Sequence, residues 1–425
     1  MTIQAARDLA ALVVPQQGGL EATGDAFEPY RLLDPTGKPV PPVAAFLCDI
    51  HGSGRPATTQ RSYGMALLRW FRFLWAVDVA WDQATRVEAR DFSRWLQAAP
   101  KPGWLSHWRA ASESAPERPR PLSLPVAPRK APGAVNPVTG KAAPGLGYAA
   151  ATRAHSEAVL RSFYEFHLET GSGPMVNPFP LSRGRGRRAN EHHNPMEPFC
   201  QQRSGLFRPR LAPRRPRRIP DDKFNELFAL LGSDRDRALV AFWVSTGARA
   251  SELLGALSGD AYPGQQLITV VRKGSRALQQ LPASPDAFVW LRLYQAALEG
   301  LVPTGPDQPL WWTLRPPFRA LAYHAAYRMF ARANEALGAN WSLHDLRHTA
   351  AYRMAQDPDM ALTDVQWVLG HARLPTTQIY VSPLPEDVIA RVLAHYQRRA
   401  EPRPTPPQSA YRPESLDVIF ARRPK

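Results

Sequence analysis

Two charged residues, Arg249 and Lys273, stand at turns where a side chain can act on a bound anion. Arg249 follows the turn Thr246-Gly247-Ala248 and begins an expected helix, where unpaired backbone N–H groups and a guanidinium can bind phosphate together. Lys273 lies on an expected hairpin turn, from which a lysine can reach into a groove and donate a proton. Both residues also have ordinary explanations, because Arg249 can pair with Glu252 and most lysines in turns are only solvated.

A second group of candidates lies in the segment 342–348. His344 and Arg347 are three positions apart, a spacing that places them on one helix face about 5–6 Å apart, so that both can bind one small anion. His348, four positions after His344, can share that face or pack behind it. As a metal pair the two histidines lack a third ligand, so we expect neither a metal nor another cofactor.

The last candidates are His371 and Tyr380. His371 follows the turn Leu369-Gly370, which would expose the imidazole at a helix end. Taken alone, a tyrosine at position 380 would usually pack in the core with its hydroxyl group at the surface. We also expect Trp341 and Trp367 to be core residues, and Glu252 to hold the helix that carries Arg249.

The composition predicts a polyanionic partner. Lys and Arg total 53 against 37 Asp and Glu, which is a formal net charge of +16 and indicates nucleic acid or an anionic surface. An apolar fraction of 44 % excludes a wholly disordered basic protein. Cys48 and Cys200 have no spacing typical of a disulfide framework or a zinc cluster. Because no apolar run reaches the roughly 18 residues that span a bilayer, we expect a cytoplasmic protein whose partner is nucleic acid.

The hydrophobic periodicity divides the chain into two helical domains. An N-terminal segment, 1–44, shows no clear period, and a small basic bundle is expected over 45–178, with helices beginning near Thr58 and spanning 87–98 and 148–169. Ten prolines mark a loop-like insertion at 100–145 within this bundle. The stretch 179–218 is an arginine-rich linker that we expect to follow phosphates, although a solvated tether is the alternative.

The second domain is expected over 219–400, followed by a basic tail at 401–425. A β-branched run at 267–271, the turn Arg272-Lys273-Gly274-Ser275 and a second run at 277–281 predict a hairpin. The fold class is therefore mainly α with a small antiparallel sheet. Helices are expected at about 221–231, 233–244, 250–257, 285–299, 318–337, 343–356, 363–369, 375–380 and 385–398.

Together the candidates resemble, in their order, the active site of the tyrosine recombinases, also called the phage integrase family. The matching motifs are Gly-x-Arg-x-Ser-Glu-Leu at 247–253, Lys-Gly at 273–274, His-x-Leu-Arg-His at 344–348, Leu-Gly-His at 369–371, and Tyr380. The resemblance covers 219–400, and the bundle is similar, less specifically, to the core-binding domain of the family. It implies the catalytic set Arg249, Lys273, His344, Arg347, His371 and Tyr380.

The resemblance implies that the Tyr380 phenol attacks a phosphodiester of double-stranded DNA. Arg249 and Arg347 would bind the two non-bridging oxygens and offset the charge that builds in the transition state. His344 and His371 would add hydrogen bonds, with His344 helping to accept the tyrosine proton. The role of His348 stays open between a second layer around the site and no role.

Lys273 is then the acid that protonates the leaving 5′-oxygen, and the product is a 3′-phosphotyrosyl bond, formed without metal or ATP. Strand exchange through a Holliday junction on a homotetramer, or on a tetramer shared with a paralogous recombinase, is also implied, as is association with the nucleoid. In the family a C-terminal helix docks on a neighbouring subunit, which would be 385–398 here.

The insertion and the linker are similar to those of recombinases from mobile elements, and the roughly 40 residues before the bundle predict no additional arm-binding domain. Two alternatives remain: a DNA-binding architectural or regulatory protein with a vestigial site, and a type IB topoisomerase. All interpretations as an enzyme require the Tyr380 oxygen to lie near a phosphate held by Arg249 and Arg347. Further DNA contacts are expected from Arg61, Arg69, Arg72, Arg214, Arg215, Arg217 and Arg218.

Overall fold

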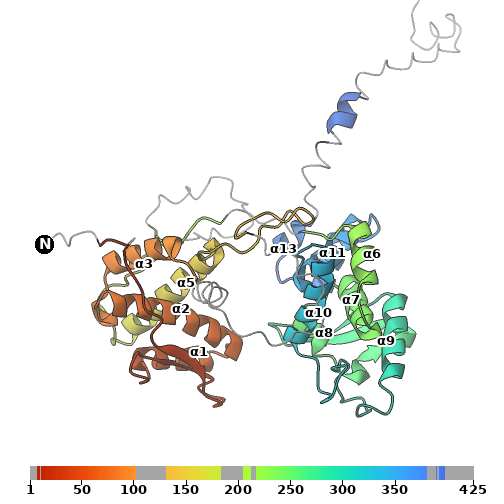
Figure 1. Cartoon of the computed structure of the whole chain (residues 1–425), viewed down its shortest axis with the longest axis horizontal. Helices are drawn as coiled ribbons and strands as arrows, with labels where there is room; N and C mark the ends of the chain where they lie inside the picture. Colours follow the sequence, from red (N-terminus) through yellow and green to blue (C-terminus); the bar gives the residue numbers. More distant parts are fainter. Residues whose placement is uncertain are drawn as a thin grey trace, which may run out of the picture. The chain divides into compact units, whose positions relative to one another are not determined.

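The computed structural model describes residues 7–9, 11–101, 131–182, 204–211, 217–380, 389 and 392–397. The chain forms two compact units, Met1–Arg214 and Arg215–Lys425, and both are mainly helical (Figure 1). The predicted fold class is confirmed, since helices dominate both units and all pairing between strands is antiparallel in the described part. Within that part, no helix is both long and apolar enough to cross a membrane.

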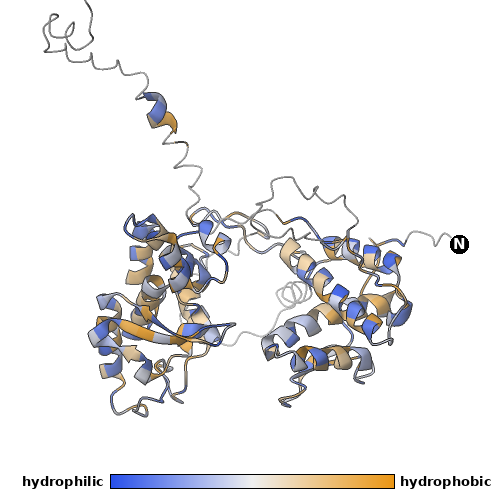
Figure 2. Cartoon of the chain, turned by 180° about the vertical axis from the view of Figure 1, so that it is seen from behind, coloured by the Kyte–Doolittle hydropathy of each residue, from blue (hydrophilic) through white to orange (hydrophobic). Residues whose placement is uncertain are grey.

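The first unit packs its helices around an aromatic core. Its elements are β1 (Gly19–Ala22), β2 (Tyr30–Leu33), α1 (Pro41–Gly52), α2 (Ala57–Ala76), a 3₁₀ turn (Trp81–Gln83), α3 (Arg86–Ala98) and α5 (Ala150–Glu169). Figure 2 shows these helices with hydrophobic residues along one side and hydrophilic residues along the other. Helix α2 contributes a buried stripe to this core, formed by Leu67, Trp70, Phe71 and Leu74. A Thr85–Glu88 capping box begins α3.

The N-terminal segment is part of this unit, which the sequence patterns do not predict. Strands β1 and β2 form an antiparallel hairpin, and Leu20 of β1 lies against Gly64 in the middle of α2. A Cβ atom at position 64 would come within 2.6 Å of the Leu20 side chain, so glycine permits this close approach. Leu32 and Val40 join the same core as the helices, although both precede the expected boundary at residue 45.

Parts of the insertion and linker of the first unit are also described. Residues 131–147 form a folded loop in which Val135 pairs with Ala142 around the buried Asn136, and Gly147 pairs with Pro100. The remainder of the expected insertion, 102–130, lies outside the described residues, as do 183–203 and 212–216 of the linker. The prolines of this stretch indicate a loop, but they do not predict the local pairing at 131–147.

The second unit surrounds helix α7, which is hydrophobic on nearly all sides and accordingly buried. It packs against α9 on one flank and α11 on another. The elements are α6 (Asp221–Ala229), α7 (Asp234–Thr246), α8 (Ala250–Leu254), β3 (Ala261–Tyr262), β4 (Leu267–Val271), β5 (Leu278–Pro282), α9 (Pro285–Ala297), α10 (Tyr323–Ala336), α11 (Leu343–Gln356), α12 (Leu362–Leu369), α13 (Pro375–Gln378) and two 3₁₀ turns (Ser258–Asp260 and Pro263–Gln265).

The predicted hairpin is confirmed as β4 and β5, which pair from Leu267 opposite Pro282 to Val271 opposite Leu278. Helices are also found at the predicted places between 221 and 380, and α11 has the predicted bounds. The largest shift is at α10, which begins five residues later than expected. Residues before it are extended instead, since Ala320 pairs with Trp312 and the Leu321 N–H donates to the Trp311 carbonyl at 2.8 Å. Residues 389 and 392–397 are helical, while the rest of 385–398 lies outside the described residues.

Candidate active site

Arg249 begins helix α8 directly after the buried helix α7. Gly247 follows the last residue of α7 and caps the helix, and its φ of +62° is a left-handed conformation that glycine adopts readily. The Arg249 guanidinium donates to Glu252 Oε1 at 2.8 Å, and the side chain is 30 % exposed. The pairing with Glu252 and an accessible guanidinium thus occur together, so the two interpretations of Arg249 do not exclude each other.

Glu252 is the acceptor around which this part of the site is organised. Its side chain is 1 % exposed, and it accepts hydrogen bonds from the backbone N–H groups of Arg249 and Lys273 and from the Arg272 guanidinium. Burial by itself raises the pKa of a carboxyl group, but these hydrogen bonds and the charge of Arg249 outweigh it and lower the pKa of Glu252. Glu252 therefore stays ionised and holds α8 to the hairpin, as its expected structural role requires.

Lys273 lies where the hairpin turns, between β4 and β5. Its side chain is exposed, and its backbone N–H donates to Glu252 Oε1 at 2.9 Å. Gly274 follows with a φ of +111°, which only glycine adopts without strain. Lys273, Arg249 and His371 line one open cavity of about 950 Å³. Arg272 and Arg373 also line it, so several cations lie along its wall.

Arg347 projects from α11 into the interior and is only 2 % exposed. Its Nη1 donates to the Gly247 carbonyl at 2.7 Å, and its Nη2 donates to the Leu369 carbonyl at 2.6 Å and to His371 Nε2 at 3.0 Å. Burial and the nearby charge of Arg249 lower its pKa to about 10, so the group stays charged at neutral pH. Arg347 thereby joins the ends of α7 and α12, which carry the predicted motifs.

His371 is neutral in this arrangement. Because the Arg347 guanidinium can only donate, His371 Nε2 must accept, and Nδ1 then donates to Thr377 Oγ1 at 2.9 Å. Burial, followed by the charges of Arg347 and Arg249, lowers the pKa of His371 to about 4. Both ring nitrogens are occupied, so a hydrogen bond from His371 to a bound phosphate needs one of these contacts to exchange.

This neutral histidine predicts a pH-dependent stability. An unfolded histidine binds a proton near pH 6.5, whereas the folded site binds it only near pH 4, so between these values the unfolded state holds more protons. The free energy of unfolding is fully present above pH 6.5 and falls as the pH drops towards 4. Urea unfolding at pH 7 and pH 5 should show a smaller loss for His371→Gln than for the unaltered chain. An equal loss in both proteins would contradict the assignment.

Tyr380 is buried, with 4 % of its surface exposed, and its ring packs beside Ala351, Val365 and Leu369. Its hydroxyl group nevertheless faces the site, because it lies 2.8 Å from His348 Nδ1. Burial raises the pKa of the phenol, and the charges of Arg347 and Arg249 act in the opposite direction. The expected core position of the ring is therefore confirmed, and its hydroxyl group, expected at the surface, contacts His348.

His348, whose role stays open in the sequence, has ring contacts with both His344 and Tyr380. The three aromatic rings of His344, His348 and Tyr380 follow one another, with centroids 4.4 Å apart in the first pair and 5.6 Å apart in the second. His344 is exposed at the outer end, and partial burial and the charge of Arg347 lower its pKa. The spacing of four residues indicated a shared face but not which histidine contacts Tyr380.

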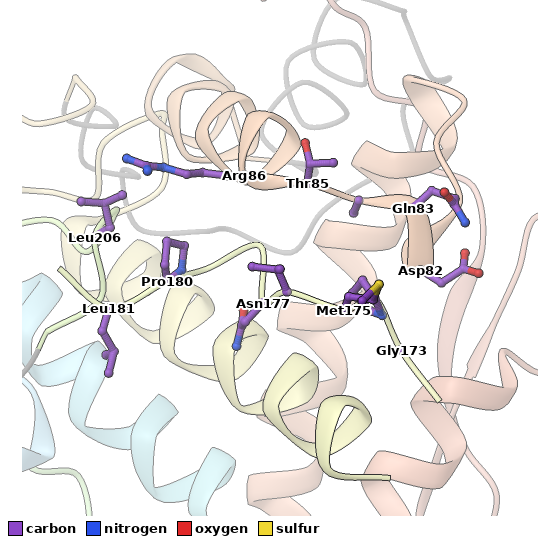
Figure 3. A pocket seen from close by; sticks show the side chains of 13 residues that line it. Asp82, Gln83, Thr85, Arg86, Gly173, Met175, Asn177, Pro180, Leu181 and Leu206 are labelled. Carbon is purple, nitrogen blue, oxygen red and sulfur yellow. The ribbon is translucent and has the colours of Figure 1, made fainter. Parts of the chain in front are cut away.

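The two tryptophans expected in the core, Trp341 and Trp367, differ in burial. Trp341 is buried as predicted, but the prediction of a core position for Trp367 is wrong, since this residue is 59 % exposed and lines the cavity beside Lys273. Helix α12 turns this side chain away from the packed side that holds Val365, Val368 and Leu369. A separate cavity of about 820 Å³ in the first unit, beside Thr85 and Asn177, contains none of the predicted site residues (Figure 3).

The arginines expected to bind DNA fall into three groups. Arg61, Arg217 and Arg218 are exposed, and Arg218 lies over the Tyr352 ring. Arg69 and Arg72 already have partners inside the first unit: Arg69 bonds Ser156 and lies over an aromatic ring, and Arg72 donates to backbone carbonyls of 16–18. Their guanidinium groups therefore hold the unit together. The expected contacts of Arg214 and Arg215 lie outside the described residues.

Residues 217–386 match the model of the phage integrase family. This part of the chain belongs to the phage integrase family. The chain is 31 % identical over 182 residues to the tyrosine recombinase XerC of Serratia marcescens, and 28 % identical over 193 residues to the tyrosine recombinase XerD of Yersinia pestis. These alignments cover 41 % and 40 % of this chain, and 58 % and 60 % of the relatives, so the chain spans less than two thirds of their length.

A solved structure has a fold similar to that of this chain. The XerH site-specific recombinase, bound to a palindromic difH substrate, has a TM-score of 0.52 and 14 % sequence identity, over 85 % of this chain and 90 % of that chain. At this identity the likeness concerns the fold. Among the described residues, no group of three or more His, Cys, Asp and Glu side chains lies close enough together to hold a metal ion.

Proposed function

We propose that the protein is a site-specific DNA recombinase that cleaves and rejoins double-stranded DNA through a 3′-phosphotyrosyl intermediate. The single observation that carries the proposal is the position of the Tyr380 hydroxyl group, which lies 2.8 Å from His348 Nδ1 and is subject to the positive charges of Arg347 and Arg249. A module that only binds DNA needs cations but no phenol held beside a base. Membership of the phage integrase family supports the same reaction.

In this reaction the Tyr380 oxygen attacks the phosphorus atom while its proton passes to His348 Nδ1. The distance of 2.8 Å favours His348 over the exposed His344 as the acceptor, which revises the expectation from the sequence. A general base at hydrogen-bonding distance is needed because burial raises the pKa of the phenol. His344 then donates a hydrogen bond to the phosphate, or it orients His348 from the outer end of the row of rings.

The bond from phosphorus to the 5′-oxygen breaks as the new bond forms, and the Lys273 ammonium supplies the proton that this leaving oxygen needs. Arg249 and Arg347 stabilise the charge on the non-bridging oxygens. The three contacts of Arg347 use three of its five N–H groups, so the guanidinium can still donate to a phosphate. Because two guanidiniums and an ammonium provide the positive charge, the proposed step needs no metal ion and no ATP.

The partner in this proposal is duplex DNA, and strands are exchanged through a Holliday junction on a homotetramer. The net charge of +16 supports a polyanionic substrate. The docking of a C-terminal helix on a neighbouring subunit remains a prediction, since most of 381–391 lies outside the described residues. The proposal that the protein serves a mobile element likewise rests on the insertion and linker, and only parts of these are described.

A nicked suicide duplex tests the proposed reaction. After cleavage a short strand carrying the 5′-hydroxyl group diffuses away, so the covalent protein–DNA adduct accumulates and can be counted on a denaturing gel. We expect an adduct on a cognate site in the presence of a metal chelator. Relaxation of any supercoiled plasmid without a specific site would favour the topoisomerase, and no adduct on any site flanking the gene would favour a DNA-binding protein.

Replacing His348 tests the choice of proton acceptor. His348→Ala should slow adduct formation by about 10²–10⁴-fold, which is the usual contribution of a general base. The loss should shrink as the pH rises, because hydroxide then removes the phenolic proton instead. His344→Ala is the matched control on the same helix face, and it should lose less and show no such recovery at high pH. If His344→Ala instead showed the larger loss in adduct formation and the recovery at high pH, the base would be His344.

A further inference from the structure

Arg272, the residue before Lys273, has no role in the reaction proposed above, yet it lies at the centre of the site. It follows strand β4 directly and begins the hairpin turn, where most side chains are exposed, but only 4 % of its surface is accessible. Burial of a charged group is costly unless paired acceptors compensate for the lost water. Paired acceptors around Arg272 must therefore compensate for its burial.

Its guanidinium joins three elements of the second unit. The Nε atom donates to Gln279 Oε1 of β5 at 2.6 Å, Nη1 donates to Glu252 Oε2 of α8 at 3.0 Å, and Nη2 donates to the Val368 carbonyl of α12. The group also lies close to Gly370, where a Cβ atom would come within 3.1 Å of Nε and 3.2 Å of Cζ. Glycine at position 370 thus leaves the space that the guanidinium occupies.

Two of these three contacts, those to Glu252 and to Val368, lead to proposed catalytic residues. Glu252, held by Arg272, accepts from the Arg249 guanidinium and from the Lys273 backbone N–H. Val368 and Gly370 belong to the turn that ends at His371. Arg272 is bonded through the chain to Lys273, whose own side chain is exposed. The position of the Lys273 backbone in relation to the arginine pair and His371 is therefore set through one buried side chain.

We propose that Arg272 is the positioning residue of the leaving-group acid, which fixes the base of the Lys273 hairpin so that its ammonium reaches the 5′-oxygen held by the arginine pair. The inference rests on the proposed function. Lysine at position 272 could not replace it, because one ammonium cannot reach three acceptors spread over a planar fork. Arg272 touches neither phosphate nor reacting atoms in this proposal, and it acts through the placement of Lys273.

A change of leaving group separates this role from a general effect on the fold. In a suicide duplex whose scissile 5′-bridging oxygen is replaced by sulfur, the leaving group departs as a thiolate, which needs no proton because a thiol has a pKa near 8.5. The phosphorus–sulfur bond breaks, the phosphorus–tyrosine bond forms, and the phenolic proton still goes to the base. Variants that impair protonation of the leaving group should therefore cleave this substrate at a near-normal rate, whereas variants that impair phosphate binding should stay slow.

Adduct formation in single turnover at saturating protein is the measurement. With the oxygen substrate, Arg272→Met should be slowed about 10²-fold, the effect of a displacement of roughly 1 Å at a catalytic group. With the sulfur substrate it should come within a few-fold of the unaltered protein, as Lys273→Ala should. Arg249→Ala should be slow with both. Arg272→Lys should be intermediate with oxygen, and Arg276→Gln, which removes an exposed cation from the same turn, should be normal with both.

An equal loss on both substrates for Arg272→Met, or no loss on either, would overturn the proposal. If that variant does not fold, as thermal unfolding would reveal, Gln279→Leu removes one contact while the ion pair with Glu252 remains, and it should show the same recovery on sulfur. Failure of the proposed function would look different, since the unaltered protein would then form no adduct with either substrate.

Discussion

Tyr380→Phe is expected to abolish the covalent adduct completely while leaving the fold intact. The substitution removes one oxygen atom, the attacking group in the proposed reaction, which lies 2.8 Å from His348 Nδ1. The ring keeps its packing against Ala351, Val365 and Leu369. The lost hydrogen bond should lower the free energy of unfolding by only about 1 kcal/mol.

The measurement for Tyr380→Phe combines the suicide duplex with a gel-shift titration on intact duplex. We expect no adduct above background, with duplex affinity within about twofold of the unaltered protein, since phosphate contacts come from cations rather than the phenol. Val365→Ala serves as a packing control, because it disturbs the same buried cluster without removing the hydroxyl group. Residual adduct in Tyr380→Phe would show that another residue is the nucleophile.

Arg347→Ala and Arg249→Ala are expected to lose cleavage alike and to differ in stability. Removing either guanidinium takes away a donor to the transition-state charge, which should cost about 10²–10³-fold or more in the rate of adduct formation. Arg347 also satisfies the buried carbonyls of Gly247 and Leu369. Two unsatisfied buried carbonyls should lower the free energy of unfolding by roughly 2–6 kcal/mol, at 1–3 kcal/mol each.

Arg249 has no comparable structural duty, because Glu252 keeps its bonds to Arg272 and to the backbone of Lys273. Arg249→Ala should therefore change the free energy of unfolding by less than about 1 kcal/mol. Urea unfolding and single-turnover cleavage on the same preparations separate the two effects, and Arg347→Lys is the control that keeps the charge. Cleavage by Arg249→Ala at the rate of the unaltered protein would remove this residue from the mechanism.

Much of the second unit could be predicted from the sequence, because its elements follow from local patterns. Ser342 and Asp345 form a capping box at the start of α11, and this signal lies within four residues of chain. The hairpin that carries Lys273 was predicted from its β-branched run and glycine turn, and β4 shows the expected alternation of buried and less buried residues. The N-terminal hairpin was not predicted, because strands of four residues carry too little pattern.

The sequence by itself determined which residue types stand at which turns and helix ends, and hence the candidate set from Arg249 to Tyr380. Helical spacing placed His344 and His348 on one face, but only packing against the segment after α13 decided that His348 meets the phenol. Local patterns also fail to predict the burial of Trp367 and Arg272. Trp367 is exposed although a core position is expected, and Arg272 is buried although it lies in a turn. Each outcome depends on contacts between segments tens of residues apart, and local periodicity contains no information about such contacts.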